Sequence, residues 1–209
     1  MKLLLASTSP RRQELLGLLG VPFQILSPTS QEVPIPGLVP VEQTQRFARE
    51  KAESVAHHYP EDLVIGSDTV IEINGSLLGK PDHMDEARLM LLQLSEKAHQ
   101  VHTGVSFRQT TKNISVDFVD TATVWLKPID DRTLQSYLAT EESLGKAGAY
   151  SIQGAGAKLI EKIEGDYTTI VGLPLWRVAK VLEEQGFKLP NPAKEIYRMK
   201  PYRNWKDFG

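Results

Sequence analysis

The chain has 209 residues, of which 41% are hydrophobic and 24% charged, and its formal net charge is -2. This composition is ordinary for a globular protein, so it excludes disorder over the whole chain. The near-neutral charge gives no general attraction to nucleic acid. Because the chain has no cysteine, a disulfide framework, a thiolate zinc site, an iron–sulfur cluster and a cysteine nucleophile are excluded.

The sequence predicts neither a membrane span nor a signal peptide. No apolar run approaches the roughly 20 residues that a span requires, and the run at residues 3–6 is too short for the core of a signal peptide. We therefore expect a soluble protein of the cytoplasm with no membrane partner.

The first half of the chain alternates between strand-like and helix-like patterns. Residues 2–6 form an apolar run typical of a strand buried on both faces. Thr8-Ser9-Pro10 then begins a helix with a hydroxyl N-cap and a proline in its first turn, and Gly20 ends it. Asn74-Gly75 predicts a hairpin turn. The other elements expected here are strands over residues 21–26, 63–66 and 70–73, and helices over residues 42–57 and 82–94, the latter capped by Asp82.

The second half adds long strands. Residues 98–126 predict two strands that meet at a turn near Lys112-Asn113. Helices are expected over residues 130–139 and 173–185, and a strand over residues 158–163. Because the pattern is not a strict β-α-β repeat, it predicts an α/β protein with a mixed sheet.

Two segments are predicted to be loops. Residues 27–40 contain four prolines, and residues 143–157 are rich in glycine and alanine. Long loops within compact domains are often functional, so both are places to look for a binding site.

Residues 188–209 form a basic and aromatic C-terminal tail beyond a main domain of residues 1–187. The tail holds six basic side chains against Glu195 and Asp207, a net charge of +4. Disordered tails are usually poor in aromatic residues, whereas this one contains Tyr197, Tyr202, Trp205 and Phe208. We expect it to pack on the body or across a dimer interface, rather than to contact RNA or DNA. Its deletion is then expected to change stability or oligomeric state and to leave the chemistry unchanged.

The segment from Ser7 to Arg12 has the residues of a phosphate site. A helix N-terminus offers backbone N–H groups and the positive end of a dipole. Ser7 adds a hydroxyl, and Arg11 and Arg12 add guanidinium groups that match phosphate oxygens. The alternative is an ordinary capped helix with solvated arginines.

Charged residues elsewhere could complete a metal and triphosphate site. Asp68 follows an apolar strand, where open α/β sheets bind ligands, and it could hold a divalent cation or accept a proton from water. Glu32 supplies a second carboxylate, and Lys51 and Lys80 supply cations. Each of these residues alone could equally be an ordinary turn or surface charge.

Other sequence patterns bear on base recognition and exclude several known catalytic and binding motifs. Gln153, in the glycine-rich loop, could read a base edge through its amide, although the loop could also be merely flexible. The five histidines show no HExxH pattern, the glycine spacing is not that of a P-loop, and the GxSxG nucleophile elbow is absent.

Eight short motifs in order across residues 2–186 resemble the Maf family of nucleoside triphosphate pyrophosphatases. They are Ser7-Thr-Ser-Pro-Arg-Arg12, the Glu32 loop, Ala48-Arg-Glu-Lys-Ala52, Gly66-Ser-Asp-Thr69, Gly79-Lys-Pro81, Lys146-Ala-Gly-Ala-Tyr150, Ile152-Gln-Gly154 and Val171-Gly-Leu-Pro174. The resemblance implies the two-lobed inosine-triphosphatase-like (Maf/Ham1) fold with a central cleft. It also implies cleavage of a nucleoside triphosphate to the monophosphate and pyrophosphate with a divalent cation, Mg or Mn, commonly by a homodimer.

The resemblance also implies the roles of individual residues. Asp68 would be the catalytic acceptor of a proton from water and, with Glu32, a metal ligand. Ser7, Arg12, Lys51 and Lys80 would bind the phosphates.

Three further positions separate two branches of the family. Arg11, Thr69 and Gln153 are similar to the branch that acts on dTTP and UTP, whereas the 7-methyl-GTP branch carries tryptophan, glutamine and glutamate there. The alternatives are a purine-preferring pyrophosphatase, or a nucleotide-binding regulator of cell division or septum formation with weak hydrolysis.

Overall fold

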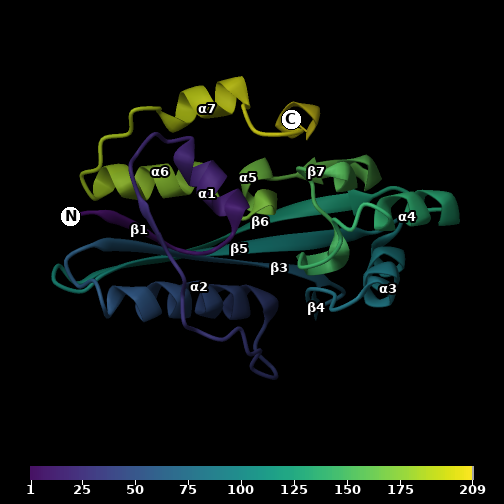
Figure 1. Cartoon of the computed structure of the whole chain (residues 1–209), viewed down its shortest axis with the longest axis horizontal. Helices are drawn as coiled ribbons and strands as arrows, with labels where there is room; N and C mark the ends of the chain where they lie inside the picture. The colour runs from purple at the N-terminus through teal and green to yellow at the C-terminus, as the bar shows by residue number, and fades with distance from the viewer. Residues whose placement is uncertain (209) are drawn as a thin grey trace. The chain divides into compact units, whose positions relative to one another are not determined.

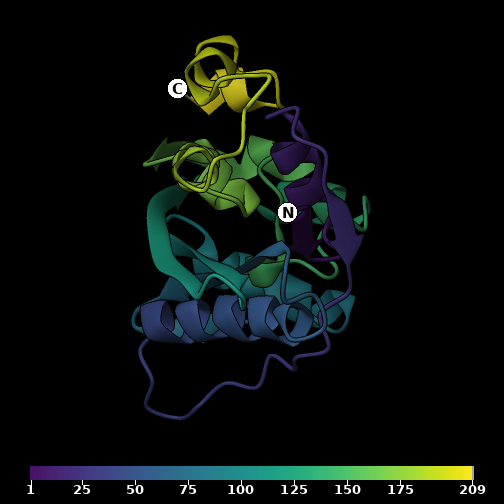
Figure 2. The same cartoon turned by 90° about the vertical axis from the view of Figure 1, so that its left-hand side faces the viewer.

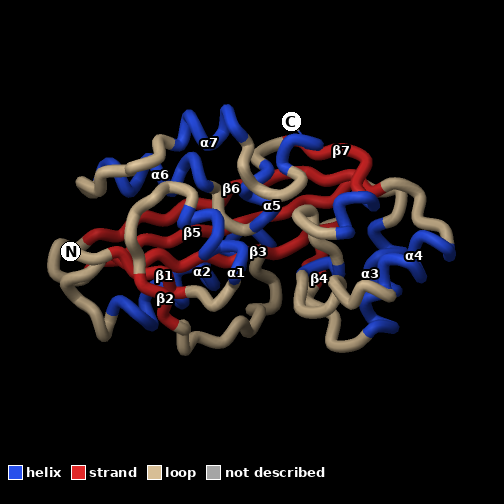
Figure 3. The backbone as a smooth tube through the Cα atoms, turned by 45° about the horizontal axis from the view of Figure 1, so that its top comes forward, coloured by secondary structure: helices blue, strands red, loops and turns tan. Residues whose placement is uncertain are grey.

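The computed structural model of the chain describes residues 1–208. Its strands form one seven-stranded sheet of order β2-β1-β3-β5-β6-β7, with β4 paired to β3 (Figure 3). The pairs of β1 with β2 and with β3 are parallel, whereas β3 with β4 and β6 with β7 are antiparallel. The strands are β1 (Leu3–Ala6), β2 (Gln24–Leu26), β3 (Leu63–Ile73), β4 (Ser76–Leu78), β5 (Ala98–Gln109), β6 (Ile114–Leu126) and β7 (Ile160–Glu164).

Helices make up about half of the described chain outside the strands. The α-helices are α1 (Pro10–Gly17), α2 (Pro40–Ala56), α3 (Met84–Leu94), α4 (Asp131–Leu138), α5 (Tyr167–Val171), α6 (Leu175–Glu184) and α7 (Ala193–Met199). Three short 3-10 helices are η1 (Ala147–Ala149), η2 (Ala155–Leu159) and η3 (Trp205–Phe208). None of the helices formed by residues 1–208 has the length and apolar character needed to cross a membrane. The sheet with both parallel and antiparallel pairs, together with these helices, confirms the expected mixed α/β fold.

The chain divides into two compact units. Unit 1 comprises Met1–Asp68, Thr103–Asp120 and Gly172–Lys200; unit 2 comprises Thr69–His102, Thr121–Val171 and, among the described residues, 201–208. The long strands β3, β5 and β6 contribute residues to both units.

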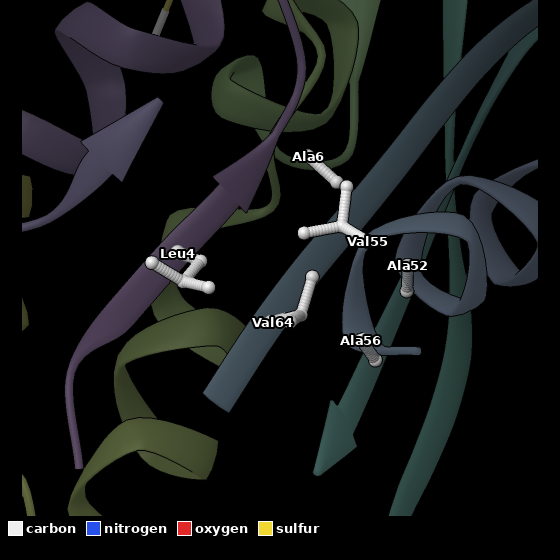
Figure 4. Close-up of a cluster of buried hydrophobic side chains, with 6 residues drawn as sticks. All are labelled: Leu4, Ala6, Ala52, Val55, Ala56 and Val64. Carbon is white, nitrogen blue, oxygen red and sulfur yellow. The ribbon is translucent and has the colours of Figure 1, made fainter. Parts of the chain in front are cut away.

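Unit 1 has helices on both faces of its strands. Helix α2 covers one face, and α1 and α6 cover the other, with α7 packed on α6 (Figures 1 and 2). Between α2 and the strands lies a core of aliphatic side chains, which Figure 4 shows: Leu4, Ala6, Ala52, Val55, Ala56 and Val64. Three of these six are alanines, and small side chains let a helix approach a sheet closely.

Two glycines bring α2 even closer to its strands. A Cβ atom on Gly66 would lie 2.3 Å from the Ala48 carbonyl oxygen and 2.5 Å from the Ala52 nitrogen. A Cβ on Gly104 would lie 2.8 Å from the Thr44 carbonyl oxygen. The backbone of α2 therefore rests directly on β3 and β5.

Unit 2 is built around hairpins and short helices. The β3–β4 hairpin turns at Asn74 and Gly75, whose φ values of 52° and 77° are those of the expected tight turn. Strand β7 pairs with β6, and α3 packs against η1 and α4.

The structure corrects several expected elements. The two strands expected over residues 63–66 and 70–73 are one continuous strand, so Asp68 lies within β3 rather than beyond a strand end. The parallel pairing with β1 stops at Gly66, but β3 continues because β4 and β5 pair with it farther along. Helix α3 is capped by His83, whose ring nitrogen accepts from the Glu86 N–H, and not by Asp82. Helix α5 was not anticipated.

We predict that Gly66→Ala destabilises the protein. The new methyl group would meet the backbone of α2, which cannot move aside as a flexible side chain would, so the free energy of unfolding should fall by about 2 kcal/mol or more. The control is Gly17→Ala, where a Cβ meets nothing within 4 Å and the change should be below about 0.5 kcal/mol. Equal midpoints of the two variants in urea would contradict the close contact of α2 with β3.

Candidate active site

A buried lysine joins two carboxylates in unit 1. Lys51 Nζ donates to Glu32 Oε1 at 2.6 Å and also hydrogen-bonds Asp68 Oδ1. The side chains of Lys51 and Asp68 are only 8% and 6% exposed, whereas Glu32 is 38% exposed. The cluster therefore has a dry interior and one side open to solvent.

Local structure explains how Asp68 and Lys51 meet. Side chains alternate along a strand, so Asp68 points to the same face of β3 as Gly66, which is the face that α2 covers. Lys51 lies in the same turn of α2 as Ala48 and Ala52, the two residues closest to Gly66. The close approach at Gly66 thus brings the ammonium group to the carboxylate.

The proline-rich loop carries Glu32 and is fastened to α2 on both sides of it. The Thr29 N–H donates to Ser54 Oγ at 3.3 Å, and the Ile35 N–H donates to the buried Gln43 Oε1 at 3.2 Å. These two attachments hold Glu32 near Lys51.

The Gly172 carbonyl connects the beginning of α1 to β3. It accepts from Arg12 Nε at 2.9 Å and from Ser67 Oγ at 3.0 Å. Arg12 also lies 3.5 Å from Ser7 Oγ, which accepts from the Ser9 N–H at 3.2 Å. Within unit 1, the Arg12 guanidinium is therefore positioned by the Gly172 carbonyl and by Ser7, and Ser67 in β3 binds the same carbonyl.

Helix α1 begins at Pro10 as expected, with Ser9 in the N-cap position. Within the described residues, however, no side-chain hydrogen bond caps the helix. Backbone N–H groups of a first turn that no side chain caps can bind an anion.

The charged groups of this cluster change one another's pKa values. Burial raises the pKa of the Asp68 carboxyl, while Lys51 and Arg12 pull it down and Glu32 raises it. Burial also lowers the pKa of the Arg12 guanidinium, which Asp68 opposes, although arginine stays charged in proteins. Asp68 is thus a carboxylate with enhanced proton affinity next to two cations.

The donor set fits a hard divalent cation only in part. Glu32 and Asp68 both contact the Lys51 nitrogen, so they are neighbouring carboxylates that could act as ligands of one ion. Mg²⁺ and Mn²⁺ take carboxylate oxygens as ligands, and Mg²⁺ usually also keeps waters and substrate phosphates. Among residues 1–208, no group of three or more His, Cys, Asp or Glu could hold a metal ion, so phosphate oxygens and water would complete the coordination.

The other expected site residues have different surroundings. Arg11 is partly buried beside Arg12 in α1, and Thr69 follows Asp68 but points to the opposite face of β3. Lys80 is exposed in unit 2 after Gly79, whose carbonyl accepts from the Gly148 N–H at 3.1 Å. Gln153 is a partly buried turn residue of unit 2, just before η2.

Sequence reasoning missed Gln43, and it placed Gly172 in a motif without assigning it a role in the site. A signal existed for Gln43, because it lies on the buried stripe of α2, where a polar side chain needs a partner. Lys51 shares that stripe. Gly172 acts through its backbone carbonyl, which every residue type has, so its identity could not indicate this role.

A family model and curated relatives identify one family. A family model described as Maf-like protein matches residues 2–185. A dTTP/UTP pyrophosphatase of Carboxydothermus hydrogenoformans is 42% identical over 187 residues, 90% of this chain and 100% of the relative. Proteins of the same name from Bacillus velezensis and Methanosarcina barkeri are 43% and 41% identical, over 90% of this chain and 98% and 96% of theirs.

The similarity to solved structures is weaker. A HAM1 protein from Coxiella burnetii has a TM-score of 0.49 and 15% identity, covering 88% of this chain and 99% of its own.

We predict that Lys51→Met destabilises the metal-free protein, because two neighbouring carboxylates lose their shared cation. The loss at neutral pH should be about 3 kcal/mol. Removing Lys51 raises the pKa of Asp68 further, so the folded state takes up a proton that the unfolded chain does not. The variant's stability then rises relative to that of the native protein as pH falls, so the deficit should shrink as the solution is acidified.

The measurement is denaturant unfolding in EDTA at several pH values. Lys180→Met is the matched control, because that lysine is 72% exposed in a surface pair and should contribute less than about 1 kcal/mol. A Lys51 variant as stable as this control, or a deficit independent of pH, would refute the role of Lys51 in balancing the carboxylates.

Proposed function

This chain belongs to the Maf family, and we propose that it is a nucleoside triphosphate pyrophosphatase, a hydrolase of phosphoric anhydrides. It converts dTTP and UTP, and related modified pyrimidine nucleotides, to the monophosphate and pyrophosphate. The dTTP/UTP pyrophosphatases at 41–43% identity support the substrate class.

One structural observation carries the proposal: the buried cluster in which Lys51 joins Asp68 and Glu32. Buried ion pairs often contribute less to stability than apolar packing of the same volume. A buried charge cluster with one open side is therefore better explained by chemistry than by folding. A triphosphate, which carries several negative charges, suits a site that also presents Arg12 and the first turn of α1.

Asp68 acts as the proton acceptor of the reaction. Its raised pKa makes it a stronger base than an exposed aspartate. Lys51 and Arg12 keep it ionised and offer positive charge to the phosphate oxygens as negative charge develops. Glu32 orients Lys51 from the solvent side.

A divalent cation, Mg or Mn, held by Asp68 and Glu32 would supply charge neutralisation of the phosphates. Ser7, Arg12, Lys51 and Lys80 are the phosphate-binding residues of the proposal. Arg11, Thr69 and Gln153 select the pyrimidine base, since they match the family branch that acts on dTTP and UTP.

The proposal also covers organisation and location. Residues 1–187 make up the pyrophosphatase domain, to which residues 188–209 are appended. The protein is a homodimer in the cytoplasm and does not bind nucleic acid. Several exposed apolar side chains in one short segment support self-association, namely Val33, Ile35, Val39 and Val41.

The proposed function is tested by product analysis. The purified protein is offered dTTP, UTP, CTP, GTP and 7-methyl-GTP with Mg²⁺ or Mn²⁺, and pyrophosphate is resolved from orthophosphate. Preferred release of pyrophosphate from dTTP and UTP is expected. Release from 7-methyl-GTP or GTP alone would overturn the base selectivity, and binding without turnover would point to a regulator.

We predict that Asp68→Asn lowers kcat by about a thousandfold or more, because the proton acceptor is lost. The fold should remain, since the amide has nearly the shape of the carboxylate and Glu32 still compensates the Lys51 charge. Asp131→Asn is the control, because the Asp131 side chain is 83% exposed. Near-native kcat for Asp68→Asn, with an unfolding temperature like that of the control, would eliminate Asp68 as the base.

A further inference from the structure

The C-terminal tail contacts the backbone on both sides of Gln153. Within unit 2, Asn204 Nδ2 donates to the Ile152 carbonyl at 3.0 Å and to the Gly154 carbonyl at 3.2 Å. One side-chain amide thus fastens the two residues that flank Gln153. Asn204 lies outside the family match, which ends at residue 185.

A second contact holds the same loop. Glu142 Oε2 accepts from the Ala155 N–H at 2.8 Å. A Cβ atom on Gly154 would lie 2.3 Å from this same oxygen, so only glycine allows the carboxylate to come this close. In the loop at residues 152–155, two carbonyls therefore accept hydrogen bonds from Asn204, and one N–H donates to Glu142.

Aromatic packing fixes the position of Asn204. Its neighbour Trp205 is 3% exposed and stacks on Tyr167 with ring centroids 5.5 Å apart and an interplanar angle of 12°. The Tyr167 hydroxyl also donates to the Arg203 carbonyl. Both neighbours of Asn204 are thus tied to Tyr167, so the amide is presented in a defined place.

We infer that the tail tunes base selectivity, with Asn204 as a positioning residue that holds Gln153 in the orientation that prefers uracil and thymine over cytosine. This inference rests on the proposed function, in which Gln153 reads the base. It replaces the expectation that loss of the tail leaves the chemistry unchanged.

The chemistry of the amide explains why positioning matters. Uracil and thymine present a carbonyl oxygen and an N–H at the edge where cytosine presents an amino group and a bare ring nitrogen. A glutamine amide has both a donor and an acceptor, so it can pair with either edge if it is free to turn over. Discrimination therefore requires that the Gln153 amide meet the base in one orientation, because a mismatched base then leaves polar groups unpaired. A backbone held on both sides of Gln153 restricts the positions from which its side chain can reach the base.

The test uses substitutions that keep the backbone conformation. Asn204 has a φ of 56°, which Asp and Gly tolerate better than Ala, so the variants are Asn204→Asp and Asn204→Gly. The matched control is Asn191→Asp, since Asn191 is a tail asparagine that donates to the Leu18 carbonyl at 2.9 Å in unit 1. The full-length protein is used, and its thermal unfolding verifies the fold.

Three quantities are measured: kcat and KM for UTP and CTP, dissociation constants for both nucleotides by calorimetry, and hydrogen exchange of the amides of residues 151–157. Both Asn204 variants should reduce the preference for UTP over CTP by about tenfold, mainly through KM. They should also speed exchange in this loop. The Asn191 variant should match the native protein in all three.

Unchanged UTP preference and unchanged loop exchange in the Asn204 variants would overturn the inference. An equal loss of kcat with every substrate would overturn it as well, because that is the result of a merely structural role. If the native protein releases pyrophosphate from no triphosphate, the proposed function fails. The dissociation constants and loop exchange then still decide whether Asn204 positions Gln153.

Discussion

Lys51 is a cation almost completely removed from solvent, and the arrangement of unit 1 follows from the need to compensate its charge. A buried ammonium group is tolerated only with partners of opposite charge, which Asp68 and Glu32 supply. Asp68 is itself buried, so it depends equally on Lys51. The loop that carries Glu32, helix α2 and strand β3 must therefore keep fixed positions relative to one another. Hydrogen bonds hold the loop to α2, and close packing at Gly66 holds α2 to β3.

The register depends on how closely α2 can approach the sheet. Gly66 and Gly104 leave room for the helix backbone, and Ala48 and Ala52 line the contact from the helix side. A lysine in the same turn then reaches a carboxylate two residues along the strand. Larger side chains at these glycines would move the ammonium away from its partners. Core packing and site electrostatics are therefore two consequences of one close contact.

The sequence predicted the elements whose signals are local. Asn74-Gly75 specified its hairpin, and the helix expected over residues 42–57 is α2 (Pro40–Ala56) in the structure. It did not predict that β3 continues through Asp68, because neighbouring strands far away in the chain stabilise those polar residues. Nor could it pair Lys51 with Asp68, which is 17 residues away, or Arg12 with the Gly172 carbonyl, 160 residues away. Motifs indicated the candidate residues, and only the fold could show their contacts.

The glycine-rich loop also depends on contacts with a distant segment, because Asn204 of the tail binds its backbone. The tail's aromatic residues led to the expectation that it packs rather than contacts RNA or DNA. In the structure Arg203 and Lys206 are exposed, while the aromatic residue between them is buried. The tail is thus attached by its aromatic and amide groups rather than by its charge. Because Asn204 contacts only backbone carbonyls in the hydrogen bonds described above, it would act on Gln153 without adding a charge to the nucleotide site. Selectivity can then change through the tail while the charge cluster around Lys51 stays intact.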